Sequence, residues 1–472
     1  MRNILLVEPD YRSKFPPLGL LRLATYHKSR GDKVTFVRGR NETLRALHWH
    51  RVYVSSLFTY ELPRTVRTIR YYRGSVDTED AIVVGGIGAT LLPDYIRDHV
   101  SCRIITGPLS KPGVIDGESK PIAKCLPDYS ILDSEEYAYR PRDSYFCRVT
   151  TGCIRNCSFC AVPKLEPGFG YFQPLRTQVD QVVKAFGERQ HLVLLDNNIL
   201  AIDDLDRVFG QIGALGFKSG ASRGGRERTV DFNQGIDARL ITKKIARKLG
   251  SLAVSPVRLA FDYRGMERPY RKAVDYLADA GFHEFTNYVM FNFKDTPRDF
   301  YERMRINLEL STKLGILVTG FPMKYTPITD VTRRHVADQW VWRYLRGIQC
   351  VLLATHGMVS PNPQFFNAAF GESFDEFLEI LSMPDRYIIY RTHYRESGAH
   401  ADWRRRFRRL SSTRRGEFLD LLAKLNRDRK RETTIGGLKH FRSLLDHYYP
   451  GGKTAPHTPL EEAARQSPSQ AV

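Results

Sequence analysis

Short apolar runs alternate with amphipathic stretches along the first part of the chain. Strands that alternate with helices in this way predict a parallel sheet covered by helices on both faces, the Rossmann or flavodoxin-like arrangement. The helical stretches between the strands include residues 18–29 and 63–72. The predicted strands are 4–7, 34–37, 52–57, 81–84 and 103–106.

A second alternation begins at Ser144 and contains six apolar runs with helical periodicity between them. This spacing is typical of a partial (β/α)6 barrel, although the sixth run has no obvious helix of its own. The predicted strands are 145–149, 191–195, 229–232, 257–261, 284–291 and 316–321, and the predicted helices are 177–188, 204–215, 243–249, 269–280 and 299–314.

Past Pro327 the alternation stops, and the pattern predicts a helical C-terminal region. Its expected helices are 331–348, 373–381, 401–410 and 415–425. The fold class is therefore α/β, with an open parallel sheet, a partial barrel and a helical region. The predicted divisions are 1–125 for the first domain, 126–143 for a linker, 144–328 for the barrel, 329–449 for the basic helical region and 450–472 for a disordered tail.

Composition narrows the class of protein. Of the 472 residues, 42% are hydrophobic and 26% are charged, which excludes wholesale disorder. The formal net charge of +20 favours a polyanionic partner such as nucleic acid. No apolar run reaches the roughly 18 residues that a membrane span requires. The N-terminal run in MRNILLVEPD is too short for a secretory signal, so we expect a cytoplasmic protein with no membrane partner.

Three of the seven cysteines fall on one short loop, which reads TTGCIRNCSFC at 150–160. Cys153, Cys157 and Cys160 have the spacing C-x3-C-x2-C. Three thiolates can hold three irons of a cubane cluster and leave the fourth iron open to an exogenous chelating group. The alternatives are a zinc site, for which Cys147 is the nearest fourth ligand, or a set of inert reduced thiols.

This loop resembles the cluster-binding loop of the radical S-adenosylmethionine superfamily. The resemblance implies that the three cysteines hold a 4Fe–4S cluster and that the methionine moiety of S-adenosylmethionine chelates the open iron. One electron from the cluster then splits the sulfonium to give a 5′-deoxyadenosyl radical. Phe159 would lie against the adenine, and a low-potential flavodoxin or ferredoxin type of protein would donate the electron.

Polar residues at later strand ends extend the resemblance. Asp196, Asn197 and Asn198 stand where the superfamily has a turn that binds the cofactor's amino group, unless they form only an Asx-rich turn. Further cofactor-binding candidates lie after the third and fourth barrel strands. Asn233, Gln234 and Asp237 could meet ribose hydroxyls, Arg239 could pair with the cofactor carboxylate or within its own helix face, and Asp262 stands where the family often carries a glutamate.

The first domain resembles the cobalamin-binding-like domain that precedes many such barrels. The matching stretches are PPLGL at 16–20 and VVGGIGATLLP at 83–93. The D-x-H-x-x-G signature, whose His ligates cobalt, is missing, and the first strand runs instead into EPDYR at 8–12. Cobalamin could bind without this lower ligand, but the sequence does not require it.

Two functional classes remain open at this point. The first is a radical enzyme that modifies a nucleic acid, a nucleoside or a small metabolite, with methyl transfer among the reactions. The second is a non-catalytic iron–sulfur protein for electron transfer or regulation. The wide spacing of Cys102, Cys125 and Cys147 argues against the second cluster that methylthiolation usually needs. The run RRRFRR at 404–409 could grip phosphates or form a solvated helix face.

Overall fold

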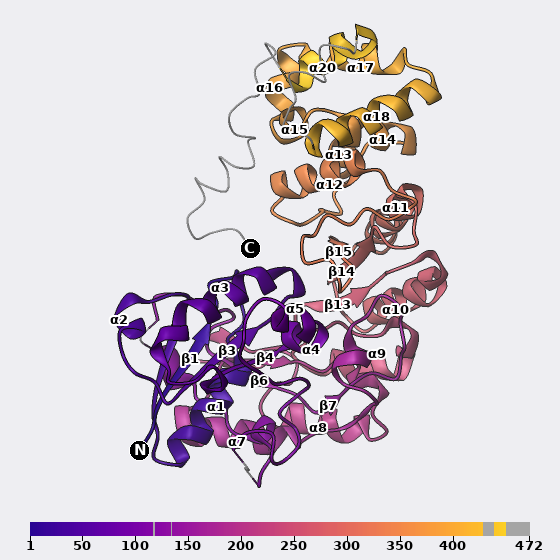
Figure 1. Ribbon diagram of the computed structural model, residues 1–472. Helices are drawn as coiled ribbons and strands as arrows, with labels where there is room; N and C mark the ends of the chain where they lie inside the picture. The colour runs from indigo at the N-terminus through magenta and orange to yellow at the C-terminus, as the bar shows by residue number, and fades with distance from the viewer. Residues whose placement is uncertain (117–118, 134, 428–438, 450–472) are drawn as a thin grey trace. The chain divides into compact units, whose positions relative to one another are not determined.

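The computed structural model describes residues 1–116, 119–133, 135–427 and 439–449 (Figure 1). The chain divides into two compact units. The first contains Met1–Arg258 and Thr326–His335, and the second contains Leu259–Tyr325 and the described residues from Val336 onward. The boundaries of these two units differ from the predicted domain boundaries, which stay predictions. The predicted disordered tail, 450–472, lies outside the described residues.

The N-terminal sheet has five parallel strands in the order β2-β1-β3-β4-β5. Residues of alternate strand positions face opposite sides, and both faces are buried, which explains why the strands read as continuous apolar runs. Leu5 and Val7 pack with α3, whereas Ile4 and Leu6 pack with α1. The strands are β1 Asn3–Glu8, β2 Lys33–Arg38, β3 Arg51–Ser56, β4 Ile82–Gly86 and β5 Arg103–Ile104. The helices are α1 Leu18–Ser29, α2 Glu42–Arg45, α3 Leu62–Tyr72, α4 Ile87–Leu91 and α5 Pro93–Arg97.

The glycine cluster after β4 serves close packing of the backbone. Gly86 has φ +104°, and a Cβ on it would lie 2.4 Å from the carbonyl oxygen of Ser56 at the end of β3. The Ser56 hydroxyl also accepts a hydrogen bond from the Ala89 amide at 2.7 Å. The cluster therefore lets α4 begin directly against the neighbouring strand.

Six further strands form two parallel sheets of three, with the orders β12-β9-β6 and β13-β14-β15. These are the strands predicted for the partial barrel, and the α/β fold class is confirmed. The strands are β6 Ser144–Cys147, β9 His191–Leu194, β12 Thr229–Phe232, β13 Val257–Ala260, β14 Glu284–Phe291 and β15 Leu317–Lys324. The helices between them are α7 Leu175–Phe186, α8 Leu205–Ala214, α9 Lys243–Gly250, α10 Glu267–Asp279 and α11 Pro297–Leu314. A short hairpin joins β10 Ser222–Arg223 to β11 Arg226–Glu227.

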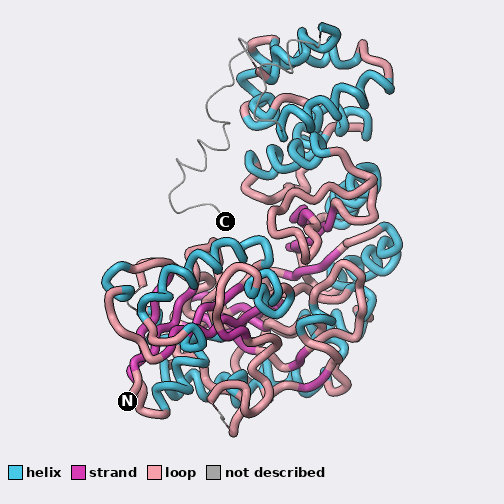
Figure 2. The backbone as a smooth tube through the Cα atoms, in the orientation of Figure 1, coloured by secondary structure: helices cyan, strands magenta, loops and turns pink. Residues whose placement is uncertain are grey.

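The C-terminal region is helical, as predicted, and Figure 2 shows it as successive helices. Its core is rich in aromatic side chains, including the fully buried Trp403, Phe377 and Phe418. Among the described residues, no helix combines the length and apolar character of a membrane span. The helices are α12 Trp342–Ala354, α13 Pro363–Phe370, α14 Phe374–Ser382, α15 Asp385–Ile389, α16 Arg391–Glu396, α17 Ala399–Arg408, α18 Ser412–Arg427 and α20 Arg442–Tyr448.

The prediction of a helix over 331–348 is wrong in its first half, because α12 begins only at Trp342. The carboxylate of Asp330 accepts hydrogen bonds from the Thr332 and His335 amides, each at 2.8 Å, and thereby forms a turn. Arg333 within that turn has φ +58°. Local side-chain-to-backbone bonds of this kind compete with a helix.

Candidate functional site

The cysteine loop follows β6 and is clamped at its start by a two-stranded antiparallel clip. In this clip β7, Thr150–Thr151, pairs with β8, Gly170–Tyr171. Gly152 follows β7 with φ +68°, and a Cβ there would lie 1.6 Å from the carbonyl oxygen of Gly168. Glycine is therefore required at this position both for the backbone conformation and for the close approach of the two segments.

The cysteine sulfurs already accept hydrogen bonds from nearby amides. The Cys153 Sγ accepts from the Arg155 amide at 3.3 Å, and the Cys160 Sγ accepts from the Val162 amide at 3.5 Å. The Cys160 amide itself donates to the Cys157 carbonyl at 3.0 Å, which tightens the turn between them. All three cysteines are partly exposed. Sulfurs that receive amide hydrogen bonds are typical of iron–sulfur ligands, whose potential such bonds tune.

Glu166, which the sequence analysis missed, braces this loop. Its carboxylate accepts from the Gly152 amide at 2.8 Å and from the Asn197 side-chain amide at 3.0 Å. It also pairs with Arg148 through two contacts of 2.6 Å. Glu166 lies between the cysteines and β8. Its carboxylate therefore connects this segment to the residues before the cysteines, Arg148 and Gly152, and to Asn197 in the turn after β9. Nothing in the local pattern around Glu166 indicates this role, because every partner is distant in sequence.

Asp196 follows β9 and is 4% exposed. Its Oδ1 accepts three hydrogen bonds from the strand that leads into the cysteines, from the Val149 amide at 2.9 Å, the Thr150 amide at 2.5 Å and the Thr150 hydroxyl at 2.7 Å. Its Oδ2 is buried and has no hydrogen-bond partner among the described residues. Burial raises the pKa of Asp196, against the bonds from Thr150 and Val149 that lower it. A buried carboxylate oxygen left without a donor is suited to a cationic ligand group.

Asn198 connects the cysteine loop to the strand end after β12. Its side-chain amide lies 3.5 Å from the Cys153 Sγ and 3.3 Å from the Asp237 Oδ2. Its own Oδ1 is buried and finds no hydrogen-bond donor in the part of the chain that the structure describes. Asp196 and Asn198 therefore contribute two buried acceptors without a donor to the same short turn after β9.

Two arginines hold Asp237. The Arg155 Nε lies 3.1 Å from one carboxylate oxygen, and the Arg239 Nε lies 2.7 Å from the other. Burial opposes ionisation of Asp237, but the hydrogen bonds and charge of Arg239, then of Arg155, bring its pKa below the ordinary value. The alternative expected for Arg239, an ion pair with a nearby residue, is therefore present as its pair with Asp237. The predicted contacts of Asp237 with a ribose and of Arg239 with a cofactor carboxylate stay predictions.

The remaining candidates are placed less tightly. Asn233 is fixed by its amide, which donates to the Leu194 carbonyl at 3.1 Å, and Gln234 is exposed and donates to the Asn233 side chain at 3.2 Å. Phe159 is partly exposed within the loop. Asp262 belongs to the second unit, where its carbonyl accepts from Arg303 at 3.0 Å. Cofactor contacts of these four residues stay predictions.

The donor set fits a cluster better than a single metal ion. Within the described part of the chain, no three His, Cys, Asp or Glu side chains are grouped so that they could hold one ion. A cubane makes a different demand, since each thiolate ligates its own iron. Cys147, the nearest candidate for a fourth zinc ligand, is 1% exposed, and burial raises the pKa of its thiol to about 12.

The arginines of the 404–409 run are largely paired with acids inside the helical region. Arg404 binds Glu376 and Glu379, each at 2.9 Å, and Arg408 binds Glu379 at 2.7 Å. Arg406 binds Asp402 at 2.8 Å. These pairs neutralise much of the charge that the sequence presents as a phosphate grip. The basic residues at 429–431 lie outside the described residues.

No family model matches the chain. Two curated relatives, both named ribosomal protein uS12 methylthiotransferase RimO, are similar to parts of it. The protein from Ruegeria pomeroyi is 27% identical over 230 residues, which cover 47% of this chain and 43% of the relative. The protein from Azorhizobium caulinodans is 30% identical over 117 residues, which cover 24% and 25%. The chain thus spans less than half the length of each relative.

Solved structures match parts of the chain at low identity. The cobalamin-dependent S-adenosylmethionine radical enzyme OxsB, with aqua-cobalamin and S-adenosylmethionine bound, has 14% identity and a TM-score of 0.46, and the match covers 71% of this chain and 54% of that one. Coproporphyrinogen III oxidase HemN from Escherichia coli, described as a radical SAM enzyme, has 13% identity and a TM-score of 0.28, over 42% and 47%. These likenesses concern the fold alone.

Proposed function

We propose that the chain is a radical S-adenosylmethionine enzyme, in which Cys153, Cys157 and Cys160 bind a 4Fe–4S cluster that cleaves S-adenosylmethionine. When bound, the cluster supplies the electron that splits the sulfonium and yields a 5′-deoxyadenosyl radical. The observation that carries the proposal is the pairing of this cysteine loop with the two buried acceptors that lack a donor, Asp196 Oδ2 and Asn198 Oδ1.

The residues around the loop then act by holding and orienting. Asn198 and the Arg155 amide stabilise the negative charge on the Cys153 sulfur by hydrogen bonding. Asp196 Oδ2 and Asn198 Oδ1 would hold the ammonium group of the cofactor, and its positive charge would compensate the buried negative charge of Asp196. Asp237 keeps Arg155 and Asn198 in place. The electron comes from a flavodoxin or ferredoxin type of donor.

Cobalamin is not part of this proposal, because the residues of the first domain do not fit it. In a sheet of this order, ligands enter the crevice between β1 and β3 at their carboxyl ends. Here Tyr11 fills that position: it is 1% exposed, and its hydroxyl lies 3.1 Å from the Ser55 Oγ at the end of β3. Glu8, at the end of β1, is 2% exposed and accepts a hydrogen bond from Tyr139, which the chain brings back over the strand end.

The methylthiolation named for the curated relatives is also left out. A second cluster would need further thiolates, because the thiolate is the form that binds metal. The further cysteines upstream of the loop, Cys102, Cys125 and Cys147, are widely spaced along the chain. Burial also raises the pKa of Cys102 to about 11 and that of Cys147 to about 12. For the substrate we propose a phosphate-bearing molecule, a nucleic acid or a nucleoside derivative, which the net charge of +20 favours.

The test is anaerobic turnover. Full-length protein reconstituted with iron and sulfide, then reduced by dithionite with S-adenosylmethionine, should release 5′-deoxyadenosine, and replacing the three loop cysteines together by Ala should abolish both iron binding and product. Cys125→Ser serves as the matched control, because Cys125 lies outside the loop, and it should retain both. Release of no 5′-deoxyadenosine by protein with a full cluster would instead support the non-catalytic iron–sulfur alternative.

A further inference from the structure

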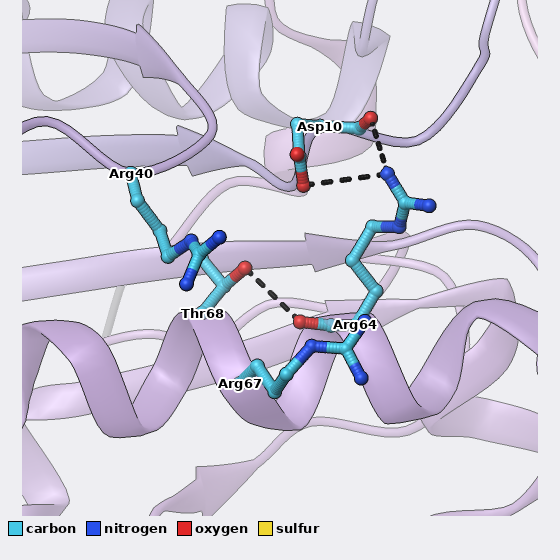
Figure 3. Close-up of a pocket in the computed structure, with 5 residues that line it drawn as sticks. All are labelled: Asp10, Arg40, Arg64, Arg67 and Thr68. Carbon is cyan, nitrogen blue, oxygen red and sulfur yellow. Dashed lines mark hydrogen bonds and ion pairs between the residues drawn. The ribbon is translucent and has the colours of Figure 1, made fainter. Parts of the chain in front are cut away.

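The carboxyl edge of the N-terminal sheet carries a small hollow with an unusual lining. Three arginines, Arg40, Arg64 and Arg67, surround it together with Asp10 and Thr68, and its volume is about 180 Å³ (Figure 3). Asp10 follows β1, Arg40 follows β2, and the other three residues lie on α3, which follows β3. In open parallel sheets this edge is where ligands bind.

Buried side chains occupy the crevice between β1 and β3 and limit the size of ligand that this edge of the sheet can bind. Tyr11 and Ser55 close the position between the strands, and Tyr139 closes the end of β1 over Glu8. A large cofactor that must insert between the strands is excluded by these side chains. None of these three side chains lines the arginine-lined cavity, whose volume of about 180 Å³ suits a small group.

The charges in the cavity are not balanced. Figure 3 shows Arg64 directed at Asp10, whose carbonyl accepts from Arg64 at 2.7 Å and whose carboxylate lies 3.5 Å away. Arg64 also pairs with Glu61 at 3.0 Å. Neither Arg40 nor Arg67 has an ion-pair partner among the described residues, and Arg40 only approaches the Tyr71 ring, at 5.9 Å from its centroid. Arg40 and Arg67 therefore line the cavity with no acidic partner of their own in the described part of the chain, while the Asp10 carboxylate, also in the lining, pairs with Arg64.

We propose that this cavity binds a phosphate group, held by Arg40 and Arg67 and positioned by the fixed Arg64–Asp10 pair. Planar guanidinium groups match phosphate oxygens in pairs, and two of them supply the charge of a phosphate dianion. The phosphate is carried either by a small molecule or by the backbone of a nucleic acid. The site is independent of the cysteine loop and of the radical chemistry, so its test requires no loaded cluster.

The decisive variant is Arg40→Gln combined with Arg67→Gln in the full-length protein. Both side chains are exposed, so the fold should be retained, and the melting temperature checks this. The matched control is Arg30→Gln combined with Arg97→Gln. It also removes two positive charges, but from residues that do not line the cavity. Calorimetric titration with pyrophosphate and anisotropy of a labelled single-stranded RNA probe the two sources.

The wild-type protein should bind at least one probe, and the cavity variant should bind it about tenfold or more weakly, whereas the control should change affinity by less than about threefold. If the cavity variant loses affinity for RNA and the wild type does not bind pyrophosphate, the phosphate belongs to a nucleic-acid backbone. If the cavity variant loses affinity for pyrophosphate, the phosphate belongs to a small molecule. For RNA, the slope of log affinity against log salt should fall by ~0.7 for each contact removed. Equal effects of the two double variants, or no binding of either probe by the wild type, would overturn the proposal.

Discussion

The side-chain amide of Asn198 lies 3.5 Å from the sulfur of Cys153, and thereby joins the turn after β9 to the first cysteine of the loop. The same amide group lies 3.3 Å from Asp237 after β12. A single side chain thus links three strand ends of the first unit. This arrangement ties the electronic properties of the proposed cluster to residues that do not ligate it.

Replacing Asn198 by Ala should make the reduction potential of the cluster more negative. A hydrogen bond to a ligand sulfur stabilises the reduced, more negatively charged state, and the variant loses that bond. A redox titration followed by electron paramagnetic resonance measures the shift. Asn197→Ala is the matched control, because Asn197 donates to Glu166 and not to a sulfur. Identical potentials for Asn198→Ala and the control would show that the amide has no influence on the cluster.

Asp196 has two separable roles, which two substitutions should distinguish. Asp196→Asn keeps an oxygen acceptor for Val149 and Thr150 but loses the charged Oδ2. We expect it to hold its iron and to bind S-adenosylmethionine more weakly by about 1.5–3 kcal/mol. Asp196→Ala should also lower the iron content, because the strand leading into the cysteines loses three hydrogen bonds. Cofactor affinity by calorimetry and iron analysis are the two readouts, and wild-type affinity in Asp196→Asn would leave the residue with a structural role alone.

Gly152→Ala should prevent the cysteine loop from forming. Its Cβ would overlap the Gly168 carbonyl at 1.6 Å, and the backbone at φ +68° disfavours any side chain. The expected result is loss of bound iron together with a lower melting temperature. The matched control is Gly170→Ala, since a Cβ at Gly170 meets nothing within 4 Å. Normal iron content in Gly152→Ala would mean that the β7–β8 clip can open without cost to the site.

The stability of the first unit should depend on pH through Glu8. Burial raises the pKa of Glu8 to about 7 from the ordinary 4.5, despite the hydrogen bond from Tyr139. The folded state therefore holds a proton that the unfolded chain releases between these values, and stability falls as pH rises from about 4.5 to about 7, by roughly 3 kcal/mol, with no further loss above.

Glu8→Gln should lack this dependence, so urea unfolding of wild type and variant compared at about pH 5 and about pH 8 isolates the contribution. We expect the variant to gain stability relative to the wild type at the higher pH. Parallel curves at the two pH values would place the ionisation of Glu8 outside this range.

Much of the fold follows from local pattern, whereas the site depends on distant contacts. The three cysteines, the strands and most helices are visible in the sequence because their spacing and periodicity are local. Glu166 carries no such signal, since its partners Arg148, Gly152 and Asn197 come together only when β7 and β8 pair. Tyr11 and Tyr139 likewise look like ordinary loop aromatics, and only the folded sheet shows that they fill its crevice. The helix expected at 331 failed because Asp330 forms a competing turn.

Because Gly152 approaches Gly168 closely, the cysteines and the segment that follows them form one structural unit. The cysteines themselves span only 153–160, but their loop takes its shape from a strand on each side and from the carboxylate of Glu166 between them. A peptide or host protein given the cysteine spacing alone would lack the support that places the sulfurs. Transplanting the site to another scaffold would therefore require the whole segment 150–171, with both glycines and Glu166, as one module.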